Sequence, residues 1–195
     1  MKKVYLLHCL SVFFMLSVMG CATVGKEFNY SARTQLLLGK TPIDEAKQLF
    51  GEPKSKKLES VKDHQFEQLT YSYAIATSGT NVRMRHLTIE FRDKVLSGMQ
   101  YISTYEEDTT AFDTDKSSQI KRGISNKHDV ENIMGTSSGK FMCPSALGGK
   151  KCDHGTEGWI WSYIYRESNK AKKDILIVTF NEDEVVTDVW LLAGN

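Results

Sequence analysis

Histidines and cysteines are the residues of this chain that could carry nucleophilic or metal chemistry. Four histidines follow the first twenty residues, at His64, His86, His128 and His154, and they do not cluster in the sequence. The chain has no glycine-rich phosphate loop and no HExxH motif. A Ser/His/Asp triad can be assembled from almost any chain of this size, so scattered candidates are weak evidence for catalysis. The sequence therefore predicts a protein that is not an enzyme and that uses no cofactor and no metal.

The N-terminus carries a different chemistry, because an apolar segment there ends in a cysteine. Lys2 and Lys3 precede the mostly apolar stretch from Val4 to Val18, and Gly20 stands before Cys21. This order resembles the lipobox of bacterial lipoprotein signals, which implies removal of residues 1–20 and acylation of Cys21. The alternatives are an ordinary secretory signal or a transmembrane anchor, but an apolar run of about fifteen residues is short of the roughly 20 that span a bilayer.

The lipobox resemblance also predicts where the protein works. One acyl chain holds a protein only marginally at a membrane, whereas several chains hold it firmly. Ala22 is not the aspartate that retains such proteins at the inner membrane of enterobacteria. For a Gram-negative source, the resemblance implies attachment to the cell outer membrane, facing the periplasm.

Charge and length exclude some partners. Removal of residues 1–20 takes away Lys2 and Lys3, so that 25 basic residues become 23 against 24 acidic ones, a formal charge of −1. This balance predicts no binding to nucleic acid. The remaining 175 residues suit one domain of ordinary size or two small ones.

A disulfide is expected late in the chain. Cys9 leaves with the signal and Cys21 takes the lipid, which leaves Cys143 and Cys152 in an oxidising compartment. The alternative is a metal site formed with Asp153 and His154. That site lacks a second ligand cluster and the usual spacing of zinc cysteines, so a disulfide is favoured.

The chain contains an internal repeat. Similar residues recur at an offset of 84 up to Gly135, and at 89 or 90 beyond it, so the second copy has gained about six residues that include the two cysteines. The pairs at offset 84 are Phe28 and Phe112, Leu36 and Ile120, Gly39 and Gly123, Thr41 and Ser125, and Gly51 and Gly135. The predicted organisation is a lipidated tether (residues 21–27), a first repeat (28–104), an acidic linker (105–111) and a second repeat (112–195).

Each repeat reads as two helices followed by three strands. A short helix is expected between the paired glycines of each copy, after another short helix that starts near Phe28 or Phe112. Alternating apolar residues predict strands at 69–73, 87–91 and 95–102, and again at 159–165, 175–180 and 185–192. The expected fold class is α+β, with two tandem ααβββ units, each a helix pair packed on its own antiparallel meander sheet.

The same short motifs occur in the same order in both copies. They are Gly39-Lys40-Thr41, Gly51-Glu52-Pro53, Tyr71-Ser72-Tyr73 and Phe91, with Gly123-Ile124-Ser125, Gly135, Trp161-Ser162-Tyr163 and Phe180 in the second copy. This order resembles the SmpA/OmlA family of BamE-like lipoproteins, which implies a role in outer-membrane protein assembly. The duplication is instead similar to the β-lactamase inhibitor protein family, which implies a two-sheet surface that grips a protein.

The second predicted sheet is apolar on both sides. Its face away from the helices carries Ile160, Ile164, Ile177 and Trp190. An apolar face needs a cover, which could be the other repeat, the disulfide loop or a partner protein, so these four residues form a possible protein-binding face. A strand register wrong by one residue would reverse the two faces. The matching face of the first sheet is polar and carries Thr70, Ser72, Thr88, Glu90, Gly98 and Gln100.

These observations predict an outer-membrane-anchored periplasmic lipoprotein that acts as a non-catalytic binding or scaffold module in envelope assembly or maintenance. The alternative is an inhibitor-type binder of a periplasmic enzyme. The expected partners are the membrane, through the lipid, and another envelope protein. Lysines 54, 56 and 57, and lysines 170, 172 and 173, could also meet anionic lipid headgroups or cell-wall polymer, or simply be solvated. About seven residues separate Cys21 from Phe28, so we expect the first repeat near the membrane and the second reaching away from it.

Overall fold

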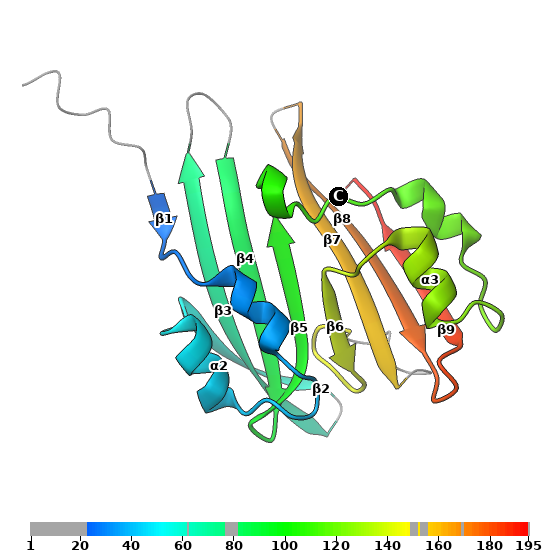
Figure 1. Cartoon of the computed structure of the whole chain (residues 1–195), viewed down its shortest axis with the longest axis horizontal. Helices are drawn as coiled ribbons and strands as arrows, with labels where there is room; N and C mark the ends of the chain where they lie inside the picture. The colour runs from blue at the N-terminus through cyan, green and yellow to red at the C-terminus, as the bar shows by residue number, and fades with distance from the viewer. Residues whose placement is uncertain are drawn as a thin grey trace, which may run out of the picture.

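A single antiparallel sheet runs through both halves of the described chain (Figure 1). The computed structural model describes residues 23–61, 63–76, 82–148, 152, 156–168 and 170–194. Strands pair in the order β1-β3-β4-β5-β6-β7-β8-β9, and β2 pairs with β3 on the same edge as β1. The strands are β1 (Thr23–Gly25), β2 (Ser55–Val61), β3 (His64–Ala76), β4 (Val82–Arg92), β5 (Val95–Ser103), β6 (Gly139–Met142), β7 (Glu157–Glu167), β8 (Lys170–Phe180) and β9 (Val186–Leu192).

Short helices cover one side of this sheet. Figure 1 shows α2 in front of the first half and α3 in front of the second. No helix in the described ranges is long and apolar enough to cross a membrane. The helices are η1 (Tyr30–Gln35), α2 (Ile43–Phe50), η2 (Glu106–Asp108), η3 (Thr114–Gln119) and α3 (Lys127–Met134), of which the three η segments are 3₁₀-helices.

The expected fold class, two ααβββ units with separate sheets, is wrong. Strand β6 joins the halves, because Gly98 of β5 pairs with Phe141, and Gly139 pairs with Ile160 of β7. The first helix of each half is a six-residue 3₁₀-helix, since a segment that short cannot repay the nucleation of an α-helix. Strands β2 and β6 also add to the sheet, and the result is a nine-stranded sheet with few short helices.

The repeat offsets recur in the hydrogen bonding. Gly51 and Gly135 end α2 and α3 with φ of 76° and 73°, a backbone region that favours glycine. Tyr71 Oη donates to the carbonyl of Gly51 at 3.1 Å, and Trp161 Nε1 donates to the carbonyl of Gly135 at 3.3 Å. In both halves an aromatic side chain from the sheet therefore ties down the end of the helix.

Two hydrophobic cores lie between the helices and the sheet, and a third lies on the opposite side, which we call the open face. The first core contains Phe28, Ala32, Leu36, Ile43, Ala46, Phe50, Leu69, Tyr71, Leu87, Ile89, Phe91, Leu96 and Tyr101. The second contains Ile120, Val130, Met134, Trp159, Trp161, Leu176, Val178, Phe180 and Val186. The third, on the open face, contains Phe141, Cys152, Ile160 and Ile177.

The segment between the halves is tied to the first half through Asp108. Its carboxylate accepts hydrogen bonds from Arg85 Nε at 2.8 Å and from Tyr101 Oη at 2.5 Å. The Arg85 guanidinium also lies 3.9 Å from the ring centres of both Tyr30 and Tyr105. Asp108 is therefore not a solvated linker charge, because its side chain is buried against a paired arginine.

Candidate protein-binding face

The open face of the first half is a row of hydrogen-bonding side chains. The strand register places Thr70 opposite Thr88, and Thr88 opposite Gln100. Gln100 Nε2 then donates to Ser162 Oγ of β7 at 2.6 Å, so the row crosses from the first half into the second. These polar groups are half-buried or buried and can pair with one another or with a partner.

The structure places the four apolar residues of the predicted binding face on this same side, in two different environments. Ile160 lies opposite Ile177, which lies opposite Trp190. Ile160 and Ile177 are only 1% and 5% exposed, because Phe141 and Cys152 pack on them. Ile164 and Trp190 are half-buried. Trp190 packs against this covered cluster, whereas Ile164 lies further along β7, opposite Lys173. The segment that begins at β6 and carries the cysteines is thus the cover for two of the four residues.

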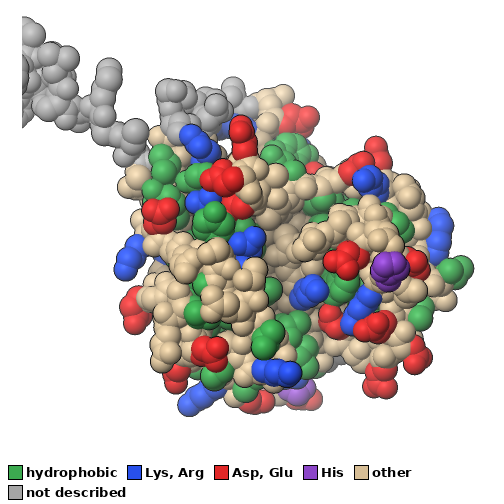
Figure 2. Space-filling model, viewed as in Figure 1, with side chains coloured by type: hydrophobic (Ala, Val, Ile, Leu, Met, Phe, Trp, Pro, Cys, Tyr) green, Lys and Arg blue, Asp and Glu red, His purple; other side chains and the backbone are tan. Residues whose placement is uncertain are grey.

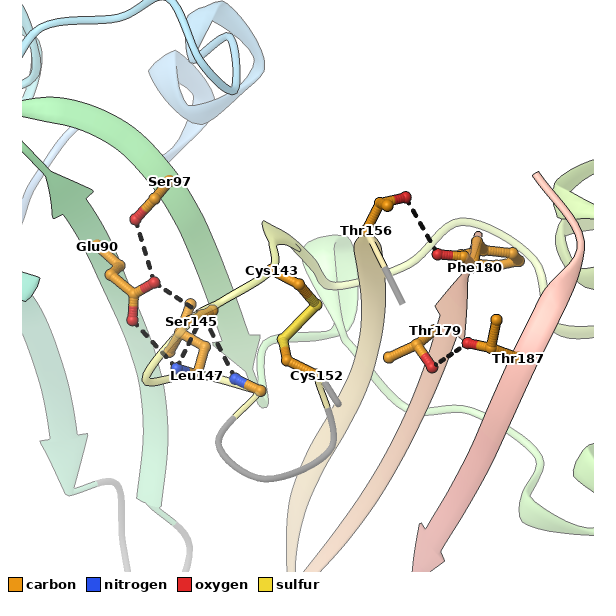
Figure 3. The surroundings of a disulfide bond; sticks show 11 residues. Glu90, Ser97, Cys143, Ser145, Leu147, Cys152, Thr156, Thr179, Phe180 and Thr187 are labelled. Carbon is orange, nitrogen blue, oxygen red and sulfur yellow. Dashed lines mark hydrogen bonds between the residues drawn. A yellow bond between two sulfur atoms is a disulfide. The ribbon is translucent and has the colours of Figure 1, made fainter. Parts of the chain in front are cut away.

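The disulfide between Cys143 and Cys152 is present, as the cysteine count predicted, with the two Cα atoms 5.3 Å apart. It closes a loop that lies on the open face of the sheet (Figure 3). The alternative metal site required Asp153 and His154, which lie outside the described residues. Within the described ranges, no group of three His, Cys, Asp or Glu side chains could hold a metal ion.

Glu90 of β4 fastens this loop to the sheet. Its carboxylate is fully buried and accepts hydrogen bonds from Ser145 Oγ at 2.7 Å and from the Leu147 backbone N–H at 3.1 Å, both in the loop (Figure 3). Two further donors come from the sheet, Gln68 Nε2 at 3.2 Å and Ser97 Oγ at 3.1 Å. The buried charge is therefore surrounded by donors, as a carboxylate out of water requires.

A β-bulge and two glycines make room for the loop. The register of β4 against β5 shifts between Glu90 and Phe91, which leaves Ser97 without a cross-strand partner and beside the Glu90 carboxylate. A Cβ added at Gly98 would lie 3.0 Å from Leu147 Cδ1, and one at Gly158 would lie 2.0 Å from the Phe141 ring. Side chains at these two positions would push the loop and Phe141 off the sheet.

The sequence did not identify Glu90 as a functional or structural centre. The alternation of apolar and polar residues along the strand placed Glu90 on a polar face, where water was expected to form its hydrogen bonds. Gly98 was the available signal, since glycine inside a strand indicates a close approach by another segment.

Beyond the loop, the open face carries His86 and Lys173. Ser72 Oγ and His86 Nδ1 share a hydrogen bond of 2.7 Å, and Thr88 Oγ1 lies 3.2 Å from His86 Nε2. Burial lowers the pKa of His86 below 6.5, and the charges of Lys173 and Lys54 lower it further. This part of the face is electropositive and suits a negatively charged group.

Lys173 is the half-buried member of this electropositive group. It pairs across the strands with Ile164, and burial lowers its pKa below 10.5. Its ammonium forms no ion pair with any described residue. Desolvation of an ammonium without a counter-charge is unfavourable, and an acidic group of a partner would offset that cost.

The Ser72–His86 contact has the distance of a serine–histidine catalytic dyad, but its surroundings differ from those of a dyad. In such a dyad a carboxylate holds the ring nitrogen opposite the serine. Here that nitrogen faces the Thr88 hydroxyl, and among the described residues no carboxylate bonds to the ring. The contact matches a cross-strand hydrogen bond, since Ser72 and His86 are direct neighbours in the register.

A cleft on the helix side was not predicted from the sequence. It has a volume of about 420 Å³, lies between the two helix groups, and is lined by residues that include Arg33, Tyr101, Lys140 and Trp161. Figure 2 shows this side of the molecule, with acidic and basic side chains mixed over it. The cleft exists because β6 joins the halves edge to edge, which sequence periodicity could not reveal.

Comparison with known proteins gives little further information. No family model matches the chain, and no curated protein matches it, so the resemblance to the SmpA/OmlA family gains no support. The fold is distantly similar to a crystal structure from Streptococcus mutans, described as a "putative beta-lactamase inhibitor protein". The TM-score is 0.43 and the identity 10%, over 87% of this chain and 100% of that chain.

Proposed function

We propose that this protein is a lipid-anchored, non-catalytic binding module of the cell envelope that holds a partner protein against its open face. The observation that carries the proposal is the loop closed by Cys143 and Cys152 and fastened to Glu90. Helices cover one side of the sheet, whereas on the other side this loop covers only the middle in the described structure. Ile164, Trp190 and the polar row remain beside it for a partner.

The open face combines features that favour protein binding. Its side chains project from long paired strands and from a cross-linked loop, so little conformational freedom is lost when a partner docks. Trp190 supplies a large, partly exposed aromatic surface of the type that dominates binding energy at interfaces. Lys173 and His86 add a positive region that would select an acidic partner surface.

The envelope location in this proposal comes from the N-terminal signal. Cys21 lies outside the described residues, so its acylation remains a proposal based on the lipobox resemblance. For a Gram-negative source the anchor would hold the module at the outer membrane, on the periplasmic side. The first described strand, β1, begins two residues after Cys21.

An inhibitor-type binder is a second candidate, favoured by the fixed loop. A loop held by a disulfide and by a buried carboxylate can occupy an enzyme cleft without the entropic cost of ordering. A scaffold in outer-membrane protein assembly, by contrast, is supported only by the short motifs of the repeat. Both candidates use the same face and differ in the kind of partner.

Affinity capture from native membranes tests the proposal. The lipidated wild type is compared with a variant carrying Lys173→Glu and Trp190→Ser on the open face. The matched control carries Lys40→Glu and Leu37→Ser, two exposed positions away from that face. We expect the wild type and the control to retain one envelope protein that the open-face variant loses. Equal retention by all three proteins would refute the proposal, and the identity of the partner separates an assembly component from an enzyme.

A further inference from the structure

The first strand fixes where the lipid anchor meets the fold. Strand β1 pairs with the last part of β3, with Thr23 opposite Ile75 and Gly25 opposite Tyr73. A Cβ on Gly25 would lie 2.1 Å from the Ser72 carbonyl oxygen, so β1 lies very close to β3. Cys21 precedes Thr23 by two residues, a reach of about 7 Å at full extension. If Cys21 is acylated, this short connection would hold the lipid near the end of the sheet where β3 stops.

The antiparallel pairing brings elements of both halves to that same end. Strand β4 begins there at Val82, β7 ends there at Glu167, and β9 ends there at Leu192. Figure 1 shows the start of β1, the end of β3, the start of β4 and the C-terminus toward one side of the molecule. We call this side the anchor edge, with Val24, Val82, Tyr165, Lys170, Leu191 and Leu192 as its defining residues.

The side chains of the anchor edge suit the interfacial zone of a bilayer. Val24, Val82, Leu191 and Leu192 are between 43% and 57% exposed. Tyr165 stacks on Tyr163 with the ring centres 5.9 Å apart, and both residues are half-buried. Exposed Lys170 lies at the same end of the sheet, opposite Glu167. Tyrosine and lysine are the residues that favour the boundary between acyl chains and water.

Apolar exposure alone does not identify this edge, because Leu37, Leu58, Val95 and Ile124 are also exposed away from it. Glu167 in the β7–β8 hairpin partly balances the lysines, so the edge is not a strongly basic patch. The anchor position indicates which end of the sheet faces the membrane. The half-buried tyrosines Tyr163 and Tyr165 lie at that same end and support the assignment.

We propose that the anchor edge lies against the membrane surface. The long strands are then roughly perpendicular to the membrane plane, and the open face is exposed to the periplasm at the side of the module. The proposal rests on the acylation of Cys21 that the proposed function includes. Strand β3 has thirteen residues, so the far end of the sheet stands about 40 Å from the bilayer. Both halves then touch the membrane, in contrast to the expectation that the second repeat reaches away from it.

Depth-dependent fluorescence quenching tests this orientation. The full mature lipoprotein is reconstituted into phosphatidylcholine vesicles that contain brominated lipid. A free thiol is introduced by Val82→Cys or Leu191→Cys at the anchor edge, or by Ile124→Cys or Leu58→Cys as matched exposed controls, and is labelled with a fluorophore. The native Cys143 and Cys152 do not react because they form the disulfide. We expect the two anchor-edge labels to lose most of their fluorescence and the two controls to keep it.

Two results would overturn the orientation. Equal quenching at both ends would show that the module tumbles or lies flat, and unquenched anchor-edge labels would show that this edge is not at the membrane. Intact mass measurement of the same samples separates the causes. A missing acyl mass contradicts the proposed anchoring itself, whereas an acylated protein without edge-specific quenching contradicts only the orientation.

Discussion

Ser145 Oγ donates a hydrogen bond of 2.7 Å to Glu90 Oε1, although the two residues are 55 positions apart in the chain. The bond links a strand of the first half to the disulfide loop of the second, on the side of the sheet away from the helices. Together with the disulfide it gives the loop two attachments, one covalent and one to a buried carboxylate. The described residues of the loop, 143–148 and 152, are thereby fixed against the open face.

Glu90→Gln should loosen this attachment. The amide keeps one acceptor oxygen, and its NH₂ group must replace either Oε1, which accepts from Ser145 and Ser97, or Oε2, which accepts from the Leu147 N–H and Gln68. One of the two bonds to the loop is therefore weakened, and we expect a loss of about 1–3 kcal/mol in the free energy of unfolding. Urea unfolding measures this loss, and hydrogen exchange of the Leu147 N–H should become faster. Glu182→Gln, at an exposed position, is the control and should change neither quantity. An unchanged Leu147 exchange rate in Glu90→Gln would show that the carboxylate does not hold the loop.

Removal of the disulfide by Cys143→Ala with Cys152→Ala should destabilise the fold and uncover part of the open face. Cross-linking a loop of this length contributes about 2–3 kcal/mol in the chain-entropy model. Ile160 and Ile177 would lose part of their cover, so binding of a hydrophobic dye should increase. A reductant should reproduce both effects in the wild type and add nothing to the variant. Dye binding that stays at the wild-type level would mean that the loop stays seated without its disulfide.

The Arg85–Asp108 pair should make the protein sensitive to acid. Burial alone would raise the pKa of Asp108, but hydrogen bonds from Arg85, Tyr101 and Ser103 hold it below 3.8. A carboxyl whose pKa is lower in the folded state stabilises the fold above about pH 4, and this contribution is lost as pH falls through the folded pKa. Asp108→Asn should cost about 1–3 kcal/mol at pH 7, because buried Arg85 then keeps only the exposed Glu107 carboxylate as a counter-charge, and should flatten the stability curve below pH 4. Unfolding curves measured at a series of acidic pH values check this, and an equally steep acid loss in the variant would exclude Asp108 as its source.

His86 should produce a second, milder pH dependence. Its pKa is lowered in the folded state by burial and by Lys173 and Lys54, so the unfolded chain binds the proton more readily. Stability should therefore fall as pH decreases below about 6.5 towards the folded pKa. His86→Gln keeps hydrogen bonding to Ser72 but does not titrate, so its stability should be flat in this range. Thermal unfolding of the wild type and of His86→Gln between pH 7 and 5 tests this expectation. If the melting temperatures of both proteins fall in parallel, another group causes the pH dependence.

The local elements were largely readable from the sequence, whereas their assembly was not. The paired glycines located α2 and α3, and the cysteine count predicted the disulfide that the structure contains. The junction was missed because β6 has only four residues, too few for an alternating pattern. The paired residues of β5 lie 39 to 43 positions earlier, and periodicity carries no information about pairing at that distance.

The binding face was also only partly predictable from the sequence. Strand parity placed Ile160, Ile164, Ile177 and Trp190 on one side, and their register agrees with that placement. Parity could not reveal that the loop covers Ile160 and Ile177, because this depends on Glu90 and on the space at Gly98. Lys173 and His86 could be recognised as parts of one electropositive region only from the structure, which places β4 and β8 in one sheet.

Site-specific photo-crosslinking in intact membranes tests most directly whether the open face holds a protein partner. A photoreactive amino acid is placed at Ile164 or Lys173 on the open face, and at Gln48 or Glu131 on the exposed sides of α2 and α3 as controls. The account predicts one discrete adduct of the same mass from both open-face positions and none from the helix positions. Adducts from Gln48 and Glu131 alone would contradict it, since the partner would then bind the helix side.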